Sequence, residues 1–251
     1  MNIRFDDRIV AVTGAGHGFG RAIARSFAGL GARVFATDLS AATLAETAAT
    51  GGIDVRAVDL RDRAAAAAWI HQIETETGRA IDVLVNNAGG VAGQRPRPLE
   101  DVTDTDWNTI FDINVNAAFT LCRAAVPAMK RAGGGRIVNT SSGAGLAPSL
   151  TGIQAYCSAK HAVVGLTRQL AHELGPFNIT VNSVAPGFIR TNAATEAQWD
   201  AYGAEGQKAL VDRIALKRLG TAQDIANAVI FFASELAGFV NGQVLQVDGG
   251  R

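Results

Sequence analysis

Tyr156 and Lys160 lie four positions apart in the stretch AYCSAKHAVVGL, residues 155–166. If this stretch is a helix, the two side chains share one face. A phenol with an ordinary pKa of about 10 is a weak base at neutral pH, and a nearby ammonium group favours its ionised form. The pair could therefore exchange a proton with a substrate hydroxyl. A half-buried aromatic beside a solvated lysine is the more common explanation, so the other elements of the chain must decide.

The composition indicates one α/β domain without a dominant charge. The chain has 251 residues, of which 48% are hydrophobic, enough for a substantial core. Lys plus Arg and Asp plus Glu number 23 each, so we expect a small-molecule substrate and no nucleic-acid or membrane partner. The charged start MNIRFDDR argues against a signal peptide and predicts a cytoplasmic protein. Cys122 and Cys157 fit reduced thiols, although one disulfide is an alternative, and no metal site is predicted.

Short β-branched runs alternate along the chain with longer alanine-rich segments. The expected strands are RIVAVTG, RVFATD, IDVRAVD, IDVLVNNAG, GRIVNTSS, ITVNSVAPG and GQVLQVDGG. Expected helices include one from about Thr105 to Arg131, one containing Tyr156, and one from about Ala222 to Ser234. The alternation predicts right-handed crossovers and a parallel sheet covered on both faces. We therefore predict a single Rossmann-like, doubly wound α/β domain over residues 1–251, with a seven-stranded parallel sheet.

Residues 189–220 interrupt this alternation between the sixth strand and the last helix. The segment is long for a connection in a compact domain, and long ordered connections often cover a substrate. We expect a substrate-binding lid, with a surface excursion of one or two short helices as the alternative. Trp199 and Tyr202 could contact the substrate there or pack on the lid itself.

A glycine cluster follows the first expected strand, in TGAGHGFGRAIA. Gly14, Gly18 and Gly20 have the spacing G-x-x-x-G-x-G, and Phe19 separates the last two. Glycines let the backbone turn tightly and approach a pyrophosphate, which would bind at the N-terminus of the next helix. Such turns also serve simple packing of a strand on a helix, but the position between a buried strand and an amphipathic helix favours a dinucleotide site.

Asp38 ends the second expected strand, where an acidic side chain can accept hydrogen bonds from the adenosine ribose. Its charge would repel a 2′-phosphate, so NAD is favoured over NADP; the alternative is a helix-capping aspartate. His17 could approach a phosphate, but a neutral imidazole does not outweigh Asp38. Asp59 could bind the adenine edge, and residues 86–90 lie at the carboxyl end of the sheet, where such folds bind ligands.

Four motifs now occur together in one chain: TGAGHGFG, NNAG, the serine pair of RIVNTSSGAG, and YCSAK. In this order, the sequence resembles the short-chain dehydrogenase/reductase family, in its single-domain branch of about 250 residues, and the resemblance covers essentially the whole chain. It implies a Rossmann fold, a nicotinamide cofactor and chemistry at a carbinol carbon.

The resemblance implies a catalytic tetrad. Tyr156 would be the general acid/base. Lys160, with the positive charge of the oxidised nicotinamide nearby, would lower the pKa of Tyr156, and Lys160 would also bind the nicotinamide ribose. Ser142 would hold the substrate oxygen, although its choice over Ser141 depends on the alignment. Asn114 would bend its helix locally and anchor a water that links Lys160 to solvent.

The resemblance also implies a larger set of cofactor contacts and an assembly. Tyr156 and Lys160 belong to this set with Gly14, His17, Gly18, Phe19, Gly20, Asp38, Leu39, Asp59, Leu60, Asn87, Ala88, Gly89, Pro186, Gly187, Ile189 and Thr191. The family commonly pairs its long helices and last strands in tetramers, and the apolar stretch FVNGQVLQVDGG fits such burial. We therefore expect a homotetramer.

Taken together, these residues predict an NAD-dependent oxidoreductase that interconverts a secondary alcohol and a ketone. Polar loop residues favour a sugar, polyol or hydroxy acid as substrate; they are Arg95, Arg97, Ser149, Thr151, Gln154 and Asn192. A 3-oxoacyl thioester or a hydrophobic or aryl ketone is the alternative, because Leu146, Leu150, Ile153 and Phe188 could line an apolar pocket. A non-catalytic NAD(H)-binding redox sensor would not need the tetrad, and a sugar-nucleotide epimerase would usually have a further domain.

Overall fold

Seven parallel strands form one sheet, in the order β3-β2-β1-β4-β5-β6-β7. A computed structural model describes residues 3–251. The strands are β1 (Ile9–Thr13), β2 (Arg33–Asp38), β3 (Ile53–Ala57), β4 (Val83–Asn86), β5 (Gly135–Thr140), β6 (Ile179–Pro186) and β7 (Val244–Val247). The predicted fold class and strand number are confirmed. β2 has the expected bounds, and the other strands are shorter than expected because residues at the ends of the sequence patterns belong to the adjoining turns.

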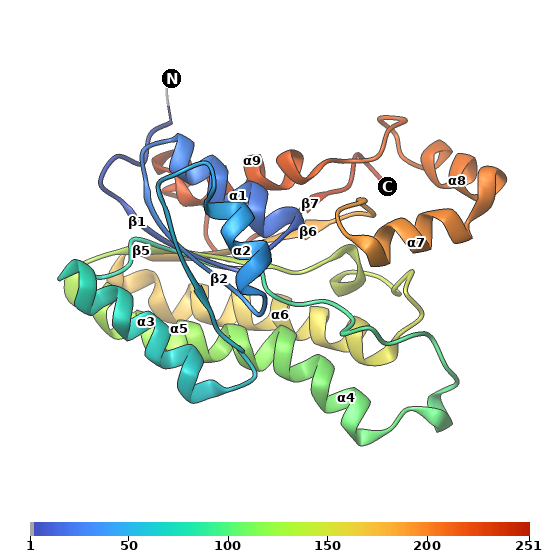
Figure 1. Cartoon of the computed structure of the whole chain (residues 1–251), viewed down its shortest axis with the longest axis horizontal. Helices are drawn as coiled ribbons and strands as arrows, with labels where there is room; N and C mark the ends of the chain where they lie inside the picture. The colour runs from blue at the N-terminus through green and yellow to red at the C-terminus, as the bar shows by residue number, and fades with distance from the viewer. Residues whose placement is uncertain (1–2) are drawn as a thin grey trace.

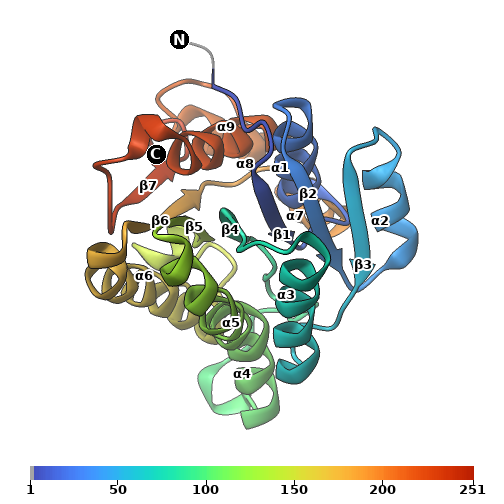
Figure 2. The same ribbon diagram turned by 90° about the vertical axis from the view of Figure 1, so that its left-hand side faces the viewer.

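Helices cover both faces of the sheet, as Figures 1 and 2 show from two directions. They are α1 (Gly18–Gly29), α2 (Ala41–Ala48), α3 (Arg63–Thr77), α4 (Asp104–Phe111), α5 (Ala117–Ala132), α6 (Gln154–Leu174), α7 (Ala193–Ala201), α8 (Gly203–Asp212) and α9 (Ala222–Ala233), with the short turns η1 (Leu99–Asp101), η2 (Asp112–Asn116), η3 (Gly143–Gly145), η4 (Gly175–Phe177) and η5 (Glu235–Ala237).

Two hydrophobic cores lie on the two faces of the sheet because successive strand residues point to opposite faces. Val10 and Val12 of β1 pack in the core that contains residues of α1, α2 and α9. Ile9 and Ala11 of the same strand pack in the core that contains residues of α3, α5 and α6. This double burial explains the near-continuous apolar sequence of the central strands.

The single helix expected from about Thr105 to Arg131 is interrupted by a π-helical turn. Helix α4 is followed by η2, which has π-helical geometry, and then by α5. The Asn114 side chain donates a hydrogen bond to the Ile110 carbonyl at 2.8 Å. That carbonyl lies one turn earlier, so the side chain takes an acceptor of the regular helical ladder. The predicted local bend at Asn114 therefore takes the form of a widened turn.

Residues 189–220 contain α7 and α8, which lie beyond the carboxyl end of the sheet, at the right of Figure 1. Helix α7 buries none of its residues, and α8 buries only Leu210. The two helices therefore form a thin layer over this end of the molecule. Across residues 3–251, none of the helices is both long enough and apolar enough to span a membrane.

Candidate active site

The sequence motifs meet at the carboxyl end of the sheet because parallel strands all end at the same edge. The glycine cluster follows β1, the NNAG motif follows β4, the serine pair follows β5, and residues 187–191 follow β6. In Figure 1 the connections that precede α4 and α6 lie at the same end as α7 and α8.

Tyr156 and Lys160 share one face of α6, as their spacing predicted. The Lys160 ammonium nitrogen lies 5.7 Å from the centroid of the Tyr156 ring. The same nitrogen donates a hydrogen bond of 2.9 Å to the Thr140 carbonyl at the end of β5. Lys160 is only 4% exposed, so this lysine is part of the interior and not the solvated neighbour of the alternative interpretation.

The lowering of the Tyr156 pKa by Lys160 and an oxidised nicotinamide stays a prediction, and the groups of this chain alone act in the opposite direction. Burial raises the pKa of Tyr156, and a hydrogen bond with the Ser142 side chain opposes this rise only in part. Burial also lowers the pKa of Lys160 to about 8. Lys160 therefore loses its proton more readily than an ordinary lysine. Lowering the pKa of Tyr156 needs further positive charge close to the phenol.

The two serines after β5 have different surroundings. The Ser141 hydroxyl is buried and donates to the Lys160 carbonyl at 3.0 Å. The Ser142 hydroxyl accepts from the Ala144 N–H at 3.1 Å and lies close enough to the Tyr156 phenol to oppose the rise of its pKa. Because the Ser141 hydroxyl is used within the fold, the geometry favours Ser142 as the serine that faces a substrate oxygen.

Asn114 links the π-helical turn to the segment after β4. Its amide nitrogen donates to the Gly90 carbonyl at 2.9 Å, and its amide oxygen accepts from the Gly90 N–H at 3.0 Å. Gly89 lies against the same group: a Cβ there would be 2.5 Å from the Asn114 oxygen and 3.3 Å from the Lys160 ammonium. A side chain at position 89 would therefore push the predicted tetrad apart.

The glycine cluster and the NNAG motif are joined by hydrogen bonds. Asn87 donates from its side chain to the carbonyls of Thr13 and Gly14, at 3.0 and 3.2 Å. The Thr13 hydroxyl accepts from the N–H groups of Asn87 and Ala88, both at 3.0 Å. A Cβ on Gly20 would lie 2.0 Å from the Gly14 carbonyl oxygen, so only glycine allows this close packing of the turn.

The start of α1 fits a pyrophosphate group. Its N-cap residue is His17, whose exposed side chain makes no capping hydrogen bond, and the first turn contains no acidic residue. By contrast, Ser40, Asp62 and Thr103 cap α2, α3 and α4 with their side chains. The first N–H groups of α1 can therefore bind an anion of a ligand.

Asp38 lies at the end of β2, where its carboxylate faces the glycine cluster. One carboxylate oxygen accepts from the Gly16 N–H at 2.9 Å, and the other accepts from the Leu39 N–H at 2.7 Å. The Leu39 side chain is 64% exposed, whereas Leu60 is buried in the core, so a cofactor contact of Leu60 would come from its backbone. Asp59 lies two residues beyond β3, and its pKa is lowered by hydrogen bonds from Arg61.

The segment after β6 reaches the glycine cluster. Gly187 donates to the Val247 carbonyl of β7 at 3.1 Å, and Ile189 is buried in the core. A Cβ on Gly18 would lie 3.2 Å from the Thr191 side chain. Thr191 is therefore a direct neighbour of the predicted pyrophosphate-binding turn. Of the remaining predicted cofactor contacts, Phe19 packs against the core and Pro186 ends β6.

Several residues expected to orient a polar substrate have partners within the fold. The Asn192 side chain caps α7 by accepting from the Thr195 N–H at 3.0 Å. The Arg97 guanidinium bonds the Asp106 carboxylate at 3.0 Å, and the Gln154 amide donates to the Arg97 carbonyl. Asn192 and Arg97 are thus held by structural contacts, which the sequence pattern did not indicate.

The hydroxyls of Ser149 and Thr151 hydrogen-bond each other at 2.7 Å, in the loop before α6. This loop lies against the segment after β4, because a Cβ on Gly152 would be 3.1 Å from Pro96. The two segments together form one wall at the end of the sheet.

The aromatic residues of segment 189–220 pack on Phe188, which directly precedes it. The rings of Phe188 and Trp199 are stacked with centroids 6.1 Å apart, and Tyr202 meets Phe188 edge-on at 5.8 Å. The Tyr202 hydroxyl accepts from the Gln198 amide at 2.7 Å. These contacts join α7 to the segment after β6, so the structure supports the packing interpretation of Trp199 and Tyr202.

Five residues near the site escaped the sequence analysis. Thr13 and Thr140 act through a hydroxyl and a carbonyl at strand ends. Gly16 donates to Asp38, and Arg21 and Thr43 lie against Gly16. Thr13 could have been found, since it directly precedes the glycine cluster. The others depend on contacts between distant segments. Cys122 and Cys157 are both free, and no group of three potential metal ligands occurs within residues 3–251.

Known proteins are similar to this chain over nearly its whole length. A family model described as enoyl-(acyl carrier protein) reductase matches residues 14–251. The (2S)-[(R)-hydroxy(phenyl)methyl]succinyl-CoA dehydrogenase subunit BbsD of Thauera aromatica is 40% identical, over 98% of this chain and 96% of that protein. The D-threitol dehydrogenase of Mycolicibacterium smegmatis is 38% identical, over 100% of this chain and 95% of that protein.

A solved structure has the same fold over the whole chain. It is that of a candidate NAD(P)-dependent gluconate 5-dehydrogenase from Beutenbergia cavernae, with NADP bound at low occupancy. Its TM-score is 0.89 at 37% identity, and the match covers 99% of this chain and 98% of that one. The chain therefore belongs to the short-chain dehydrogenase/reductase family of NAD(P)-binding oxidoreductases.

Proposed function

We propose that this protein is an NAD-dependent dehydrogenase that interconverts a secondary alcohol and a ketone. The proposal rests on one observation. Tyr156, Lys160 and Ser142 lie together at the same end of the sheet as the glycine cluster. A redox sensor has no need of this proton-transferring set. The proposed substrate is a sugar, polyol or hydroxy acid, and the proposed lid is residues 189–220.

Each residue of the tetrad has a distinct part in the proposed reaction. Tyr156 takes the hydroxyl proton of the alcohol when its phenolic oxygen is ionised, and in the reverse direction the neutral phenol returns that proton. Ser142 donates to the substrate oxygen and keeps it beside that phenol. Lys160 and Asn114 fix the geometry through the Thr140 carbonyl and Gly90. The nicotinamide supplies the hydride acceptor or donor at the carbinol carbon.

Asp38 supports NAD as the preferred cofactor. Its carboxylate is fixed by two backbone N–H groups and lies beside Gly16 of the glycine cluster. A fixed negative charge there binds ribose hydroxyls and repels a 2′-phosphate. NADP in the Beutenbergia cavernae structure is a property of that protein, and the charge of Asp38 argues for the other cofactor in this chain.

Polar groups support the substrate class. The paired hydroxyls of Ser149 and Thr151 belong to the loop before α6, and two relatives are described as acting on threitol and gluconate. A thioester is the second candidate, because one relative is described as acting on a succinyl-CoA. The half-exposed Leu150 and the partly exposed Leu146 of the same loop support it.

A panel of alcohols tests this proposal. We expect the purified protein to reduce NAD with at least one polyol, sugar acid or other hydroxy acid. We also expect it to use NADP at least about tenfold less efficiently than NAD, which corresponds to a free-energy difference of about 1.4 kcal/mol between the two cofactors. Aryl alcohols and 3-oxoacyl thioesters serve as comparison substrates. Activity confined to 3-oxoacyl thioesters with NADPH would refute both the substrate class and the role of Asp38.

We further propose that the protein is a cytoplasmic homotetramer. The two free cysteines fit a reducing compartment. Apolar side chains are exposed around the edge strand β7: Phe239 fully, Leu236 at 46% and Leu245 at 41%. Light scattering should give four times the chain mass of 26.1 kDa, and Phe239→Asp should give a smaller assembly because it would bury a charge. A monomeric wild-type protein would contradict the proposal.

A further inference from the structure

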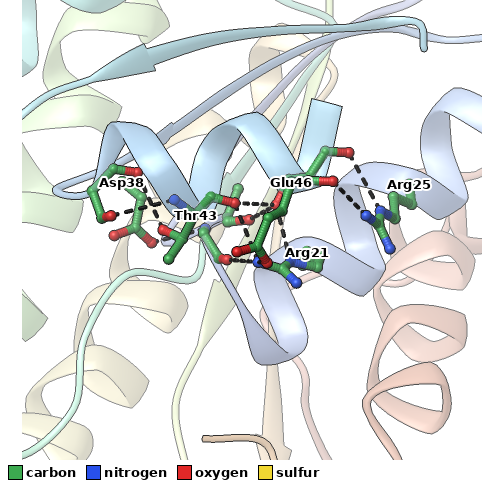
Figure 3. Close-up of polar contacts among 9 residues, drawn as sticks. Arg21, Arg25, Asp38, Thr43 and Glu46 are labelled. Carbon is green, nitrogen blue, oxygen red and sulfur yellow. Dashed lines mark hydrogen bonds and ion pairs between the residues drawn. The ribbon is translucent and has the colours of Figure 1, made fainter. Parts of the chain in front are cut away.

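Arg21 links helix α2 to the glycine cluster by hydrogen bonds, as Figure 3 shows. Its guanidinium donates to the carbonyls of Gly16 and Thr43, the latter at 3.2 Å. It also donates to the Thr47 hydroxyl at 3.1 Å and pairs with Glu46 at 2.8 Å. One side chain thus joins the turn after β1 to three positions of α2.

Gly16 links Arg21 to Asp38 through its backbone carbonyl and N–H groups. Its carbonyl accepts from Arg21, and its N–H donates to the Asp38 carboxylate at 2.9 Å. A Cβ on Gly16 would lie 2.4 Å from the Thr43 hydroxyl and 2.9 Å from the Asp38 carboxyl carbon. The space between the glycine cluster and α2 is therefore closed, and Gly16 is held on one side by Arg21 and on the other by Asp38.

We propose that Arg21 is a positioning residue for cofactor discrimination, which acts through Gly16 on Asp38. A carboxylate held in one place can accept from two ribose hydroxyls and keeps its charge where a 2′-phosphate would bind. Without Arg21 the turn at Gly16 can shift, its N–H no longer holds the carboxylate, and the carboxylate can rotate toward solvent, so NAD binds more weakly and NADP is less strongly excluded. This inference rests on the proposed NAD preference.

Arg25 is a matched control on the same pair of helices. One turn after Arg21 on α1, it donates to the backbone carbonyls of Glu46 and Thr47 on α2. It makes no contact with the glycine cluster among the described hydrogen bonds. Figure 3 shows both arginines beside α2. Both reach Glu46 and Thr47, but only Arg21 also bonds the Gly16 carbonyl. Loss of Arg25 should therefore loosen the helix pair without releasing Asp38.

The test measures binding without turnover. Calorimetry gives the dissociation constants of NAD and NADP for the wild type, Arg21→Met, Arg25→Met, Asp38→Asn and the double variant of Arg21 and Asp38. We expect Arg21→Met to lower the NAD preference about tenfold, as loss of a hydrogen bond to a charged group predicts. Arg25→Met should stay within about twofold of the wild type. In the Asp38→Asn background, Arg21→Met should add nearly nothing, because the two residues act as one unit.

Several results would overturn the inference. An unchanged preference in Arg21→Met, an equal change in Arg25→Met, or a full additional loss in the double variant would each show that Arg21 does not act through Asp38. A wild type that prefers NADP, or an Asp38→Asn variant with unchanged preference, would overturn the proposed cofactor as well. If Arg21→Met does not fold, Gly16→Ala tests the same contact, since its methyl group would meet Asp38 and Thr43. It should also lower the NAD preference, and an unchanged value would refute the inference.

Discussion

Replacing Tyr156 by phenylalanine is expected to lower kcat about a thousandfold and leave the dissociation constant of NAD within about twofold, since a general acid/base contributes on the order of 10²–10⁴. The variant keeps the ring beside Lys160 and loses only the phenolic oxygen that would carry the proton. Steady-state kinetics at saturating NAD, with a substrate from the alcohol panel, measure kcat. Calorimetry measures the dissociation constant of NAD.

Tyr202 provides the matched control, because it is the other of the two tyrosines in the chain. Its hydroxyl accepts from the Gln198 amide within the lid segment. Tyr202→Phe should therefore retain most of kcat and alter mainly the KM for the alcohol. If Tyr156→Phe keeps more than a tenth of the wild-type kcat, the phenol is not the proton carrier. Equal losses in both variants would also contradict its special role.

Replacing Lys160 by methionine is expected to abolish activity and to stabilise the fold. Burial lowers the pKa of Lys160 from 10.5 to about 8, which corresponds to about 3 kcal/mol of destabilisation of the charged form. Methionine fills a similar volume without a charge. Loss of the hydrogen bond to the Thr140 carbonyl offsets about 1 kcal/mol of the stability gained by removing the buried charge. We therefore expect the free energy of unfolding at pH 7 to rise by about 1–2 kcal/mol in urea titrations.

The pH dependence gives this prediction a second readout. Because the pKa of Lys160 is lower in the folded than in the unfolded chain, the unfolded chain binds more protons between about pH 8 and 10.5. Wild-type stability should therefore gain from this group as the pH rises through that window, and Lys160→Met should lack the gain. The exposed Lys208 pairs with Asp212 on the surface, so Lys208→Met serves as a control that keeps the wild-type profile. A Lys160→Met protein that is less stable at pH 7 and keeps this pH dependence would contradict the account.

The sequence predicted the fold and the meeting place of the motifs because both follow from local patterns. Alternating strand and helix segments dictate a parallel sheet, and parallel strands bring the turns after β1, β4, β5 and β6 to one edge. The spacing of Tyr156 and Lys160 alone placed them on one helix face. These inferences needed no knowledge of contacts between distant residues.

What the sequence left open depends on such contacts. The direction of the Tyr156 pKa follows from burial, which the Y-x-x-x-K spacing does not report. Asn192 caps α7 because the chain turns into a helix there, and Asn114 widens a helical turn by competing for a backbone carbonyl. The hydrogen bonds from Arg21 to α2 join residues that only the folded chain brings together.

Hydride transfer from a labelled alcohol tests the central claim most directly. The measurement uses a polyol or hydroxy acid with deuterium on the carbinol carbon, unlabelled NAD and mass spectrometry of the reduced nucleotide. We expect the wild type to transfer one deuterium to the nucleotide, and Tyr156→Phe to do so about a thousandfold more slowly. A protein that binds NAD but transfers no label from any secondary alcohol, or one whose transfer rate is the same in Tyr156→Phe, would contradict the claim.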